Sequence, residues 1–224
     1  SELAAAITAL LAAATGRFGR TEILSLLEYR VVRDAAGIAA VSMSALARLV
    51  DEARIRWGVV GADRSTRHGL PALEEGTWRA GLRALASRHP PAEHRVLDPD
   101  PEAELVGALT DWVERLIAVR GEATGSHPAA AWREMAERWL DTLFAVKADE
   151  DIEAMRELRR AIDQTLAELE DADSDARITL DVLNDAVAEL LDSAPITGEL
   201  RGGVRIAALD AGAVIPARVV MIAG

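Results

Sequence analysis

Residues 98–121, DPDPEAELVGALTDWVERLIAVRG, carry the signals that decide the fold class. Asp100 suits the N-cap of a helix, and Pro101 suits its first position, where no intrahelical N–H bond is needed. Gly121 is typical of a helix end. Between these signals apolar residues recur every three to four positions, which predicts a long helix with one buried face. The buried face comprises Leu105, Leu109, Trp112, Val113 and Leu116.

The same period recurs on both sides of this segment and predicts further helices, with Thr21 and Ser42 as N-caps. These helices are expected at residues 3–14, 21–29, 42–55, 77–89, about 128–146, 152–169 and 180–191. Residues 56–76 are rich in Gly, Pro and small polar side chains, which predicts a long ordered loop. Two β-rich stretches follow at 204–209 and 219–223, and the second is apolar on both faces, as in a buried parallel sheet. The sequence therefore predicts a mainly α protein, an array of about eight helices with a short C-terminal β-pair.

Charge is distributed unevenly along the chain. The 224 residues have a formal net charge of −12, which argues against a module that holds nucleic acid by its overall field but leaves room for a local basic face. Arginines cluster between residues 48 and 95, and acidic residues cluster between 134 and 192. No cysteine is present, so disulfides and thiolate metal sites are excluded. No secretion signal is recognisable at the N-terminal end, and a cytoplasmic location is expected.

The chain lacks the usual motifs of phosphate and metal chemistry. There is no P-loop motif, no H-E-x-x-H motif and no nucleophile–His–Asp set, and the four histidines lack ligand spacing. Catalytic and metal-ligating residues are therefore expected to be none. Trp132 and Trp139 could form a base-stacking platform, but their spacing of seven favours a core role. Trp57 and Trp78 each lie beside an arginine and near a glycine, and packing with the arginines holding loop carbonyls is favoured over a DNA contact.

A family resemblance rests on the stretch around these two tryptophans. Residues 53–86, ARIRWGVVGADRSTRHGLPALEEGTWRAGLRALA, resemble the gamma chain of exodeoxyribonuclease V, the RecC family, whose members carry I-R-W-G-x-D, a polar loop and T-W-R-x-G-L. The chain departs from that pattern at Val60, where an acid is common. Residues 16–38 and 202–224 resemble the segments that enter and leave this region in the family. The resemblance spans nearly the whole chain, although residues 100–195 match by helix pattern more than by motif.

This resemblance implies a helical 2B-type inserted domain at residues 1–198 and the start of a second RecA-like (2A) domain, cut short, at 199–224. In active superfamily 1 helicases the returning strand carries T-x-H-x-x-K-G-L-E-F. A degenerate version is expected here, because each aligned residue removes a donor or a charge that DNA or nucleotide binding would use. The aligned residues are Ala208, Asp210, Ala213, Val214 and Pro216.

The function implied is a non-catalytic structural and DNA-channel domain of the gamma subunit of a RecBCD-like helicase–nuclease that acts on double-strand breaks. RecB-like and RecD-like subunits and DNA ends and single strands are the implied partners. ATP and Mg would be used by those subunits, with no cofactor in this segment and no membrane contact. The DNA-proximal residues expected are Arg56, Trp57, Trp78 and Arg79. Two alternatives stay open: the 2B domain of an active UvrD-like or RecB-like ATP-dependent helicase, and a helical adaptor without a DNA role.

Overall fold

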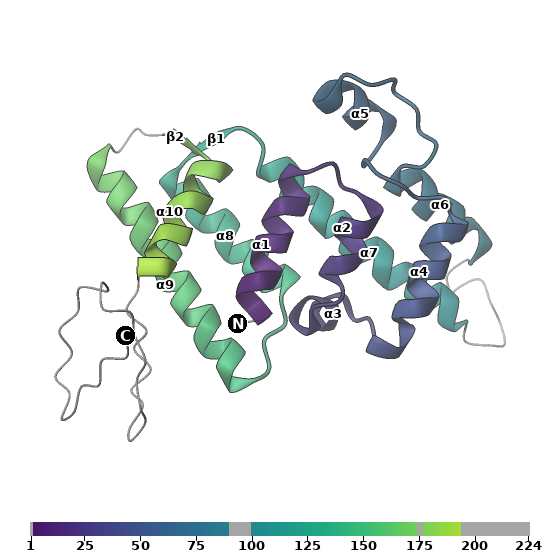
Figure 1. Ribbon diagram of the computed structural model, residues 1–224, viewed down its shortest axis with the longest axis horizontal. Coiled ribbons are helices and arrows are strands. Elements are labelled where there is room, and N and C mark those ends of the chain that lie inside the picture. The colour runs from purple at the N-terminus through teal and green to yellow at the C-terminus, as the bar shows by residue number, and fades with distance from the viewer. Residues whose placement is uncertain (1, 90–99, 174–176, 194–224) are drawn as a thin grey trace, which may run out of the picture. The chain divides into compact units, whose positions relative to one another are not determined.

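The computed structural model describes residues 2–89, 100–173 and 177–193, without the side chains of residues 188 and 190–193. These ranges contain ten α-helices, a short 3₁₀ helix and one pair of short strands (Figure 1). The mainly α fold class is therefore confirmed. The predicted β-pair at 204–209 and 219–223 lies outside the described residues. The chain divides into a unit of Ser1–Asp192 and a second unit of Ser193–Gly224, whereas the expected domain boundary between residues 198 and 199 stays a prediction.

The helices follow one another with short connections. Their bounds are α1 Glu2–Thr15, α2 Arg20–Leu26, α3 Arg30–Ala36, η1 Ala40–Ser42, α4 Met43–Glu52, α5 Gly61–His68, α6 Trp78–Arg88, α7 Pro101–Glu122, α8 Ala129–Leu143, α9 Asp149–Ala172 and α10 Leu180–Ser193. Within the first unit, α4, α5 and α6 lie at one end of α7, and α8, α9 and α10 lie at the other (Figure 1).

Helix α7 organises the core, and it begins where the sequence predicts. The Asp100 carboxylate accepts a hydrogen bond from the Glu102 N–H at 3.0 Å, and Pro101 occupies the first turn. The helix packs against α1, α3, α4, α6 and α8. Leu109, Trp112, Val113 and Leu116 are buried as expected, whereas Val106 rather than Leu105 completes the buried face. One hydrophobic cluster runs from Leu3 in α1 to Leu183 in α10 through this helix.

The tryptophans of α8 belong to the core, as their spacing predicts. Trp132 is fully buried and Trp139 is 6% exposed, and their rings meet edge to face with centroids 5.9 Å apart. The Trp132 indole N–H donates to the Ile178 carbonyl at 2.9 Å. Ile178 lies in strand β2, Arg177–Thr179, which pairs antiparallel with β1, Ser126–Pro128. The sequence did not predict this small pair. It joins the connection between α9 and α10, which contains β2, to the segment just before α8, which contains β1.

Helices α3 and α5 were not predicted from the sequence, and the caps of two other helices differ from those predicted. Helix α3 forms at residues 30–36, between the helices expected at 21–29 and 42–55. Residues 56–76 were expected to be a loop, but α5 forms within them and ends at Gly69, whose φ is 64°. Its N-terminal Gly61 N–H donates to a Glu74 carboxylate oxygen at 3.0 Å, so a residue beyond the helix caps it. Helix α2 is capped at Gly19 by Glu22 rather than at Thr21. Ser42 makes no side-chain cap, because a 3₁₀ turn leads directly into α4.

None of the helices in residues 2–89, 100–173 and 177–193 is both long and apolar enough to cross a bilayer.

Candidate functional site

The Arg-Trp-Gly sequence at residues 56–58 forms a junction between three segments of backbone. Gly19 and Trp57 form an antiparallel bridge, and the Arg20 N–H donates to the Arg56 carbonyl at 2.8 Å. The N–H of Trp78 then donates to the Gly58 carbonyl at 2.9 Å. Gly58 has a φ of 79°, a conformation that side chains other than glycine rarely adopt. The motif therefore joins the start of α2, the end of α4 and the start of α6.

The second motif, Thr77-Trp78-Arg79-x-Gly81-Leu82, is mostly a packing element. Thr77 is fully buried, and its hydroxyl caps α6 by accepting from the Ala80 N–H at 3.4 Å. The Trp78 ring is fully buried and its indole N–H donates to the Phe18 carbonyl at 3.0 Å. Gly81 packs so closely against Ile55 that a Cβ added to it would lie 2.1 Å from Ile55 Cγ1, which leaves no room for a larger residue. These contacts explain the residue types of the motif without a ligand.

Arg64 of α5 holds the loop between the two motifs. Its side chain is 7% exposed, and its guanidinium donates to the carbonyls of Leu73, Glu75 and Trp57 at 2.9, 2.8 and 2.8 Å. The same group lies over the Trp57 ring, 4.6 Å from its centroid. The favoured reading, an arginine that holds loop carbonyls, is therefore right in kind but belongs to Arg64 rather than Arg56 or Arg79. Sequence reasoning missed Arg64, because its partners are backbone groups that leave no side-chain pattern.

Arg120 of α7 is a second buried arginine beside this loop. It is 3% exposed and donates to the carbonyls of Ala14 and Gly16 at 3.1 and 2.7 Å. Its Nη2 lies 3.4 Å from Asp63 Oδ2, and Asp63 also pairs with Arg67 at 2.9 Å. Burial lowers the pKa of Arg120, and the charge of Asp63 opposes that shift. Arg120 therefore links α7 to the end of α1 and to α5.

The four residues predicted to lie near DNA have different surroundings. Trp78 has no exposed surface, which supports the packing role that was favoured for it. Arg79 is exposed but forms a two-bond ion pair with Glu114, at 3.0 and 2.8 Å. Arg56 is exposed and pairs with no carboxylate in the described residues, and Trp57 is half-buried. The DNA contact stays a prediction for each of the four.

Arg56 belongs to a set of exposed arginines without an ion pair in residues 2–89. The set comprises Arg17, Arg54, Arg56, Arg83 and Arg88. The Arg17 guanidinium lies 6.0 Å from the Trp57 ring centroid, so positive charge and an aromatic face come together beside the Arg-Trp-Gly junction. This arrangement suits attraction of a phosphate backbone more than chemistry on a substrate.

The described residues offer little for metal or acid–base chemistry. Residues 2–89, 100–173 and 177–193 contain no cluster of three or more His, Asp or Glu side chains placed to hold a metal ion. His68 meets the Trp57 ring edge to face at 5.5 Å, and its buried Nε2 lacks a hydrogen-bond partner, so it acts as a packing group here. The degenerate helicase motif, Ala208, Asp210, Ala213, Val214 and Pro216, lies outside the described residues.

Comparison with known proteins agrees with the family resemblance that the two motifs indicate. The model of the RecBCD enzyme subunit RecC fourth domain matches residues 1–195. RecBCD enzyme subunit RecC of Mycobacterium tuberculosis (strain CDC 1551 / Oshkosh) is 30% identical over 146 residues, which are 61% of this chain and 13% of that protein. RecBCD enzyme subunit RecC of Mycolicibacterium smegmatis is 31% identical over 159 residues, 66% of this chain and 14% of that protein. The chain thus spans a small part of the length of these curated relatives, and it belongs to the RecC fourth-domain family.

Proposed function

We propose that this chain is a non-catalytic scaffold and DNA-channel domain of the gamma subunit of a RecBCD-like helicase–nuclease that processes double-strand breaks. The family membership supports a place in such a subunit. The observation that carries the non-catalytic role is that both motifs serve to hold the fold together. Thr77, Trp78, Gly81 and Leu82 are committed to packing, and Arg-Trp-Gly is committed to a backbone junction.

In this proposal the partners are RecB-like and RecD-like subunits, and ATP and Mg²⁺ are used by those subunits. The DNA-facing surface lies beside Trp57, with Arg56 and Arg17 at its centre. Strong net negative charge elsewhere means that the domain alone would hold DNA weakly. Its basic surface would therefore act within an assembly that brings the DNA end to it.

The test is DNA-end binding by the assembled complex as a function of salt. Arg56→Ala should weaken binding and reduce the slope of log K against log salt by about one, because one phosphate contact is lost. Arg79→Ala should have a smaller effect, since Arg79 is paired with Glu114. Arg160→Ala is the matched control, because Arg160 is also exposed and unpaired in the described residues but lies on α9.

An unchanged salt slope for Arg56→Ala, with normal folding by circular dichroism, would remove the DNA-channel role. A slope that falls equally for Arg160→Ala would show a general charge effect instead. Either result would leave the scaffold role resting on the family membership and the motif packing alone.

A further inference from the structure

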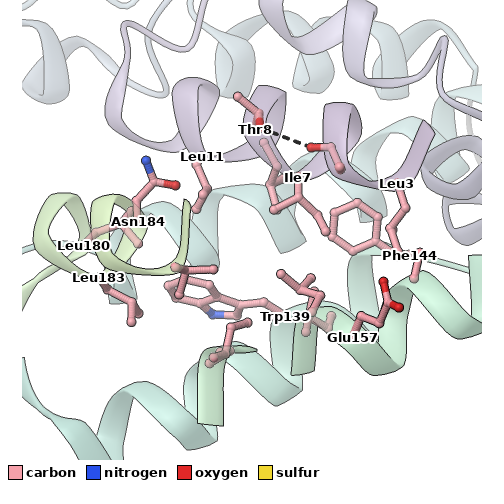
Figure 2. Close-up of a pocket in the computed structure, with 18 residues that line it drawn as sticks. Leu3, Ile7, Thr8, Leu11, Trp139, Phe144, Glu157, Leu180, Leu183 and Asn184 are labelled. Atoms are coloured by element: carbon pink, nitrogen blue, oxygen red, sulfur yellow. Dashed lines mark hydrogen bonds between the residues drawn. The ribbon is translucent and has the colours of Figure 1, made fainter. Parts of the chain in front are cut away.

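An apolar groove lies among α1, α8, α9 and α10, away from the junction motifs. It encloses about 300 Å³, at the lower end of the range of ligand pockets. Figure 2 shows Leu11 and Ile7 of α1 above Trp139, Leu3 beside Phe144, and Leu180 and Leu183 of α10 at the left of the groove. Water in such an apolar space would lack hydrogen-bond partners, so a protein or ligand surface that covers it would gain stability.

The groove has the length of a short helical contact. Its lining runs from Leu3 to Leu11 on α1, from Ala154 to Ile162 on α9 and from Leu180 to Val187 on α10. Each run covers about two helical turns, or about 12 Å at 1.5 Å per residue. That matches the apolar stripe that a helix presents at positions i, i+3 or i+4, and i+7 when it enters a groove.

The charges around the groove are predominantly acidic. Glu157, the one charged side chain among the lining residues, is exposed and has no ion pair in the described residues. Glu150 and Glu168 are also exposed and lie 7 and 11 residues from Glu157, so the three form one row along α9. Helix α10, which contributes four lining residues, has acidic but no basic residues.

Basic side chains near this rim are few, and most are already paired. Helix α1 has no Lys or Arg, and its charged residue is Glu2. On α9, Arg156 pairs with Glu153 and Arg159 pairs with Asp141, at 3.0 and 2.6 Å. Arg160 is left without an ion pair in the described part of α9. The rim would therefore attract a partner with basic flanks and disfavour an acidic one.

We propose that this groove docks an amphipathic helix of a partner polypeptide, with an apolar stripe flanked by arginine or lysine. The inference rests on the groove and its rim, and it does not depend on the DNA role of Arg56. A failure of one proposal therefore leaves the other standing.

Binding of a labelled peptide to the chain tests this inference. The probe is a fluorescein-labelled helical peptide with leucines at i, i+3, i+4 and i+7 and arginines on both sides, measured by fluorescence anisotropy at low salt. A second peptide keeps the leucines but replaces each arginine by glutamate. The basic peptide should bind about tenfold more tightly than the acidic one, because the rim repels acidic flanks.

Two pairs of variants localise the binding. Val187→Arg places a charge on the groove wall and should weaken binding of the basic peptide by about tenfold or more. Val182→Arg makes the same change on the exposed side of α10 and should leave binding unchanged. Glu157→Arg should weaken binding about two- to fivefold, as expected for an exposed charge pair. Its control is Glu134→Arg, an exposed residue of α8 outside the groove.

Because Glu157 is exposed, Glu157→Arg remains informative if Val187→Arg fails to fold. Equal binding of both peptides, or no binding of either, would overturn the proposal. Dimerisation of the chain that Val187→Arg abolishes, seen by light scattering, would identify a second copy as the occupant and would also overturn it.

Discussion

At the scale of single residues, Arg64 shows how a buried charge can hold a loop without a carboxylate. Its three carbonyl acceptors lie in Trp57, Leu73 and Glu75. Arg64→Ala should lower the free energy of unfolding by about 2–4 kcal/mol, because three hydrogen bonds from a charged, buried side chain to part-buried loop carbonyls are lost. Urea denaturation measures this, and hydrogen exchange should quicken in residues 69–76. Arg64→Lys should recover little, since an ammonium cannot match the planar guanidinium geometry.

Arg83→Ala is the control for that change, because Arg83 is exposed and unpaired among the described residues. It should alter the free energy of unfolding by no more than about 0.5 kcal/mol. Similar stability losses for both variants would show that Arg64 contributes charge or helix propensity rather than loop contacts.

Gly81 is a second residue whose role is steric. An added Cβ would lie 2.1 Å from Ile55 Cγ1 and 2.6 Å from Cδ1, and Ile55 is fully buried. Gly81→Ala should therefore destabilise the protein by about 1–3 kcal/mol through overpacking. Gly107→Ala on α7 should do the opposite and stabilise by about 0.5–1 kcal/mol, because nothing lies within 4 Å of its Cβ position. The double variant Gly81→Ala/Ile55→Ala should cost less than the sum of the two single changes, which thermal melts can measure.

At the scale of elements, local signals predicted the helices that have strong caps and an apolar stripe. The Asp100–Pro101 start of α7 and the Trp132–Trp139 face of α8 are examples. Helix α5 was missed because it carries no such stripe: its buried residues are Gly61 and Arg64, and its cap comes from Glu74. Likewise the motifs pointed to the right loop, but not to Arg120, whose carbonyl acceptors in Ala14 and Gly16 are more than 100 residues away in the chain.

The contact between α7 and α8 supplies a prediction of pH dependence. Glu122 accepts hydrogen bonds from the Trp139 indole at 2.7 Å and from Arg138 at 2.9 Å. Burial raises the pKa of Glu122, but these bonds and the Arg138 charge outweigh it, so the pKa is lowered from 4.5 overall. A lowered pKa means that the stabilisation is present above about pH 4.5 and is lost as pH falls through the folded-state value. Glu122→Gln should therefore show a smaller drop in Tm between pH 7 and acid.

Glu134→Gln is the matched control for Glu122→Gln, because Glu134 is exposed and unpaired in the described part of α8. Its fall in Tm on acidification should equal that of the unaltered protein. A Glu122→Gln variant with the same fall would show that the pair across α7 and α8 contributes no pH-dependent stability.

At the scale of the whole first unit, the charge asymmetry of the sequence becomes an asymmetry in space. The unpaired arginines at residues 17, 54, 56, 83 and 88 lie in or beside α1–α6, whereas the row of exposed glutamates lies on α9. The two proposed surfaces therefore have opposite signs, although α1 lines the groove and Arg17 lies just beyond the end of this helix. Because α7 packs against α1, α4 and α6 as well as α8, the two ends share one core.

That shared core predicts cooperative unfolding of residues 1–192. Leu116 lies at 3% exposure within α7, in the cluster that joins α1 to α10. Leu116→Ala should lower the free energy of unfolding by about 2–5 kcal/mol, whereas Leu70→Ala, at an exposed position, should change it little. Far-ultraviolet circular dichroism and tryptophan fluorescence should follow one urea transition, because buried tryptophans lie in α6, α7 and α8. Two separate transitions, with only one shifted by Leu116→Ala, would instead show that the α4–α6 end and the α8–α10 end unfold independently.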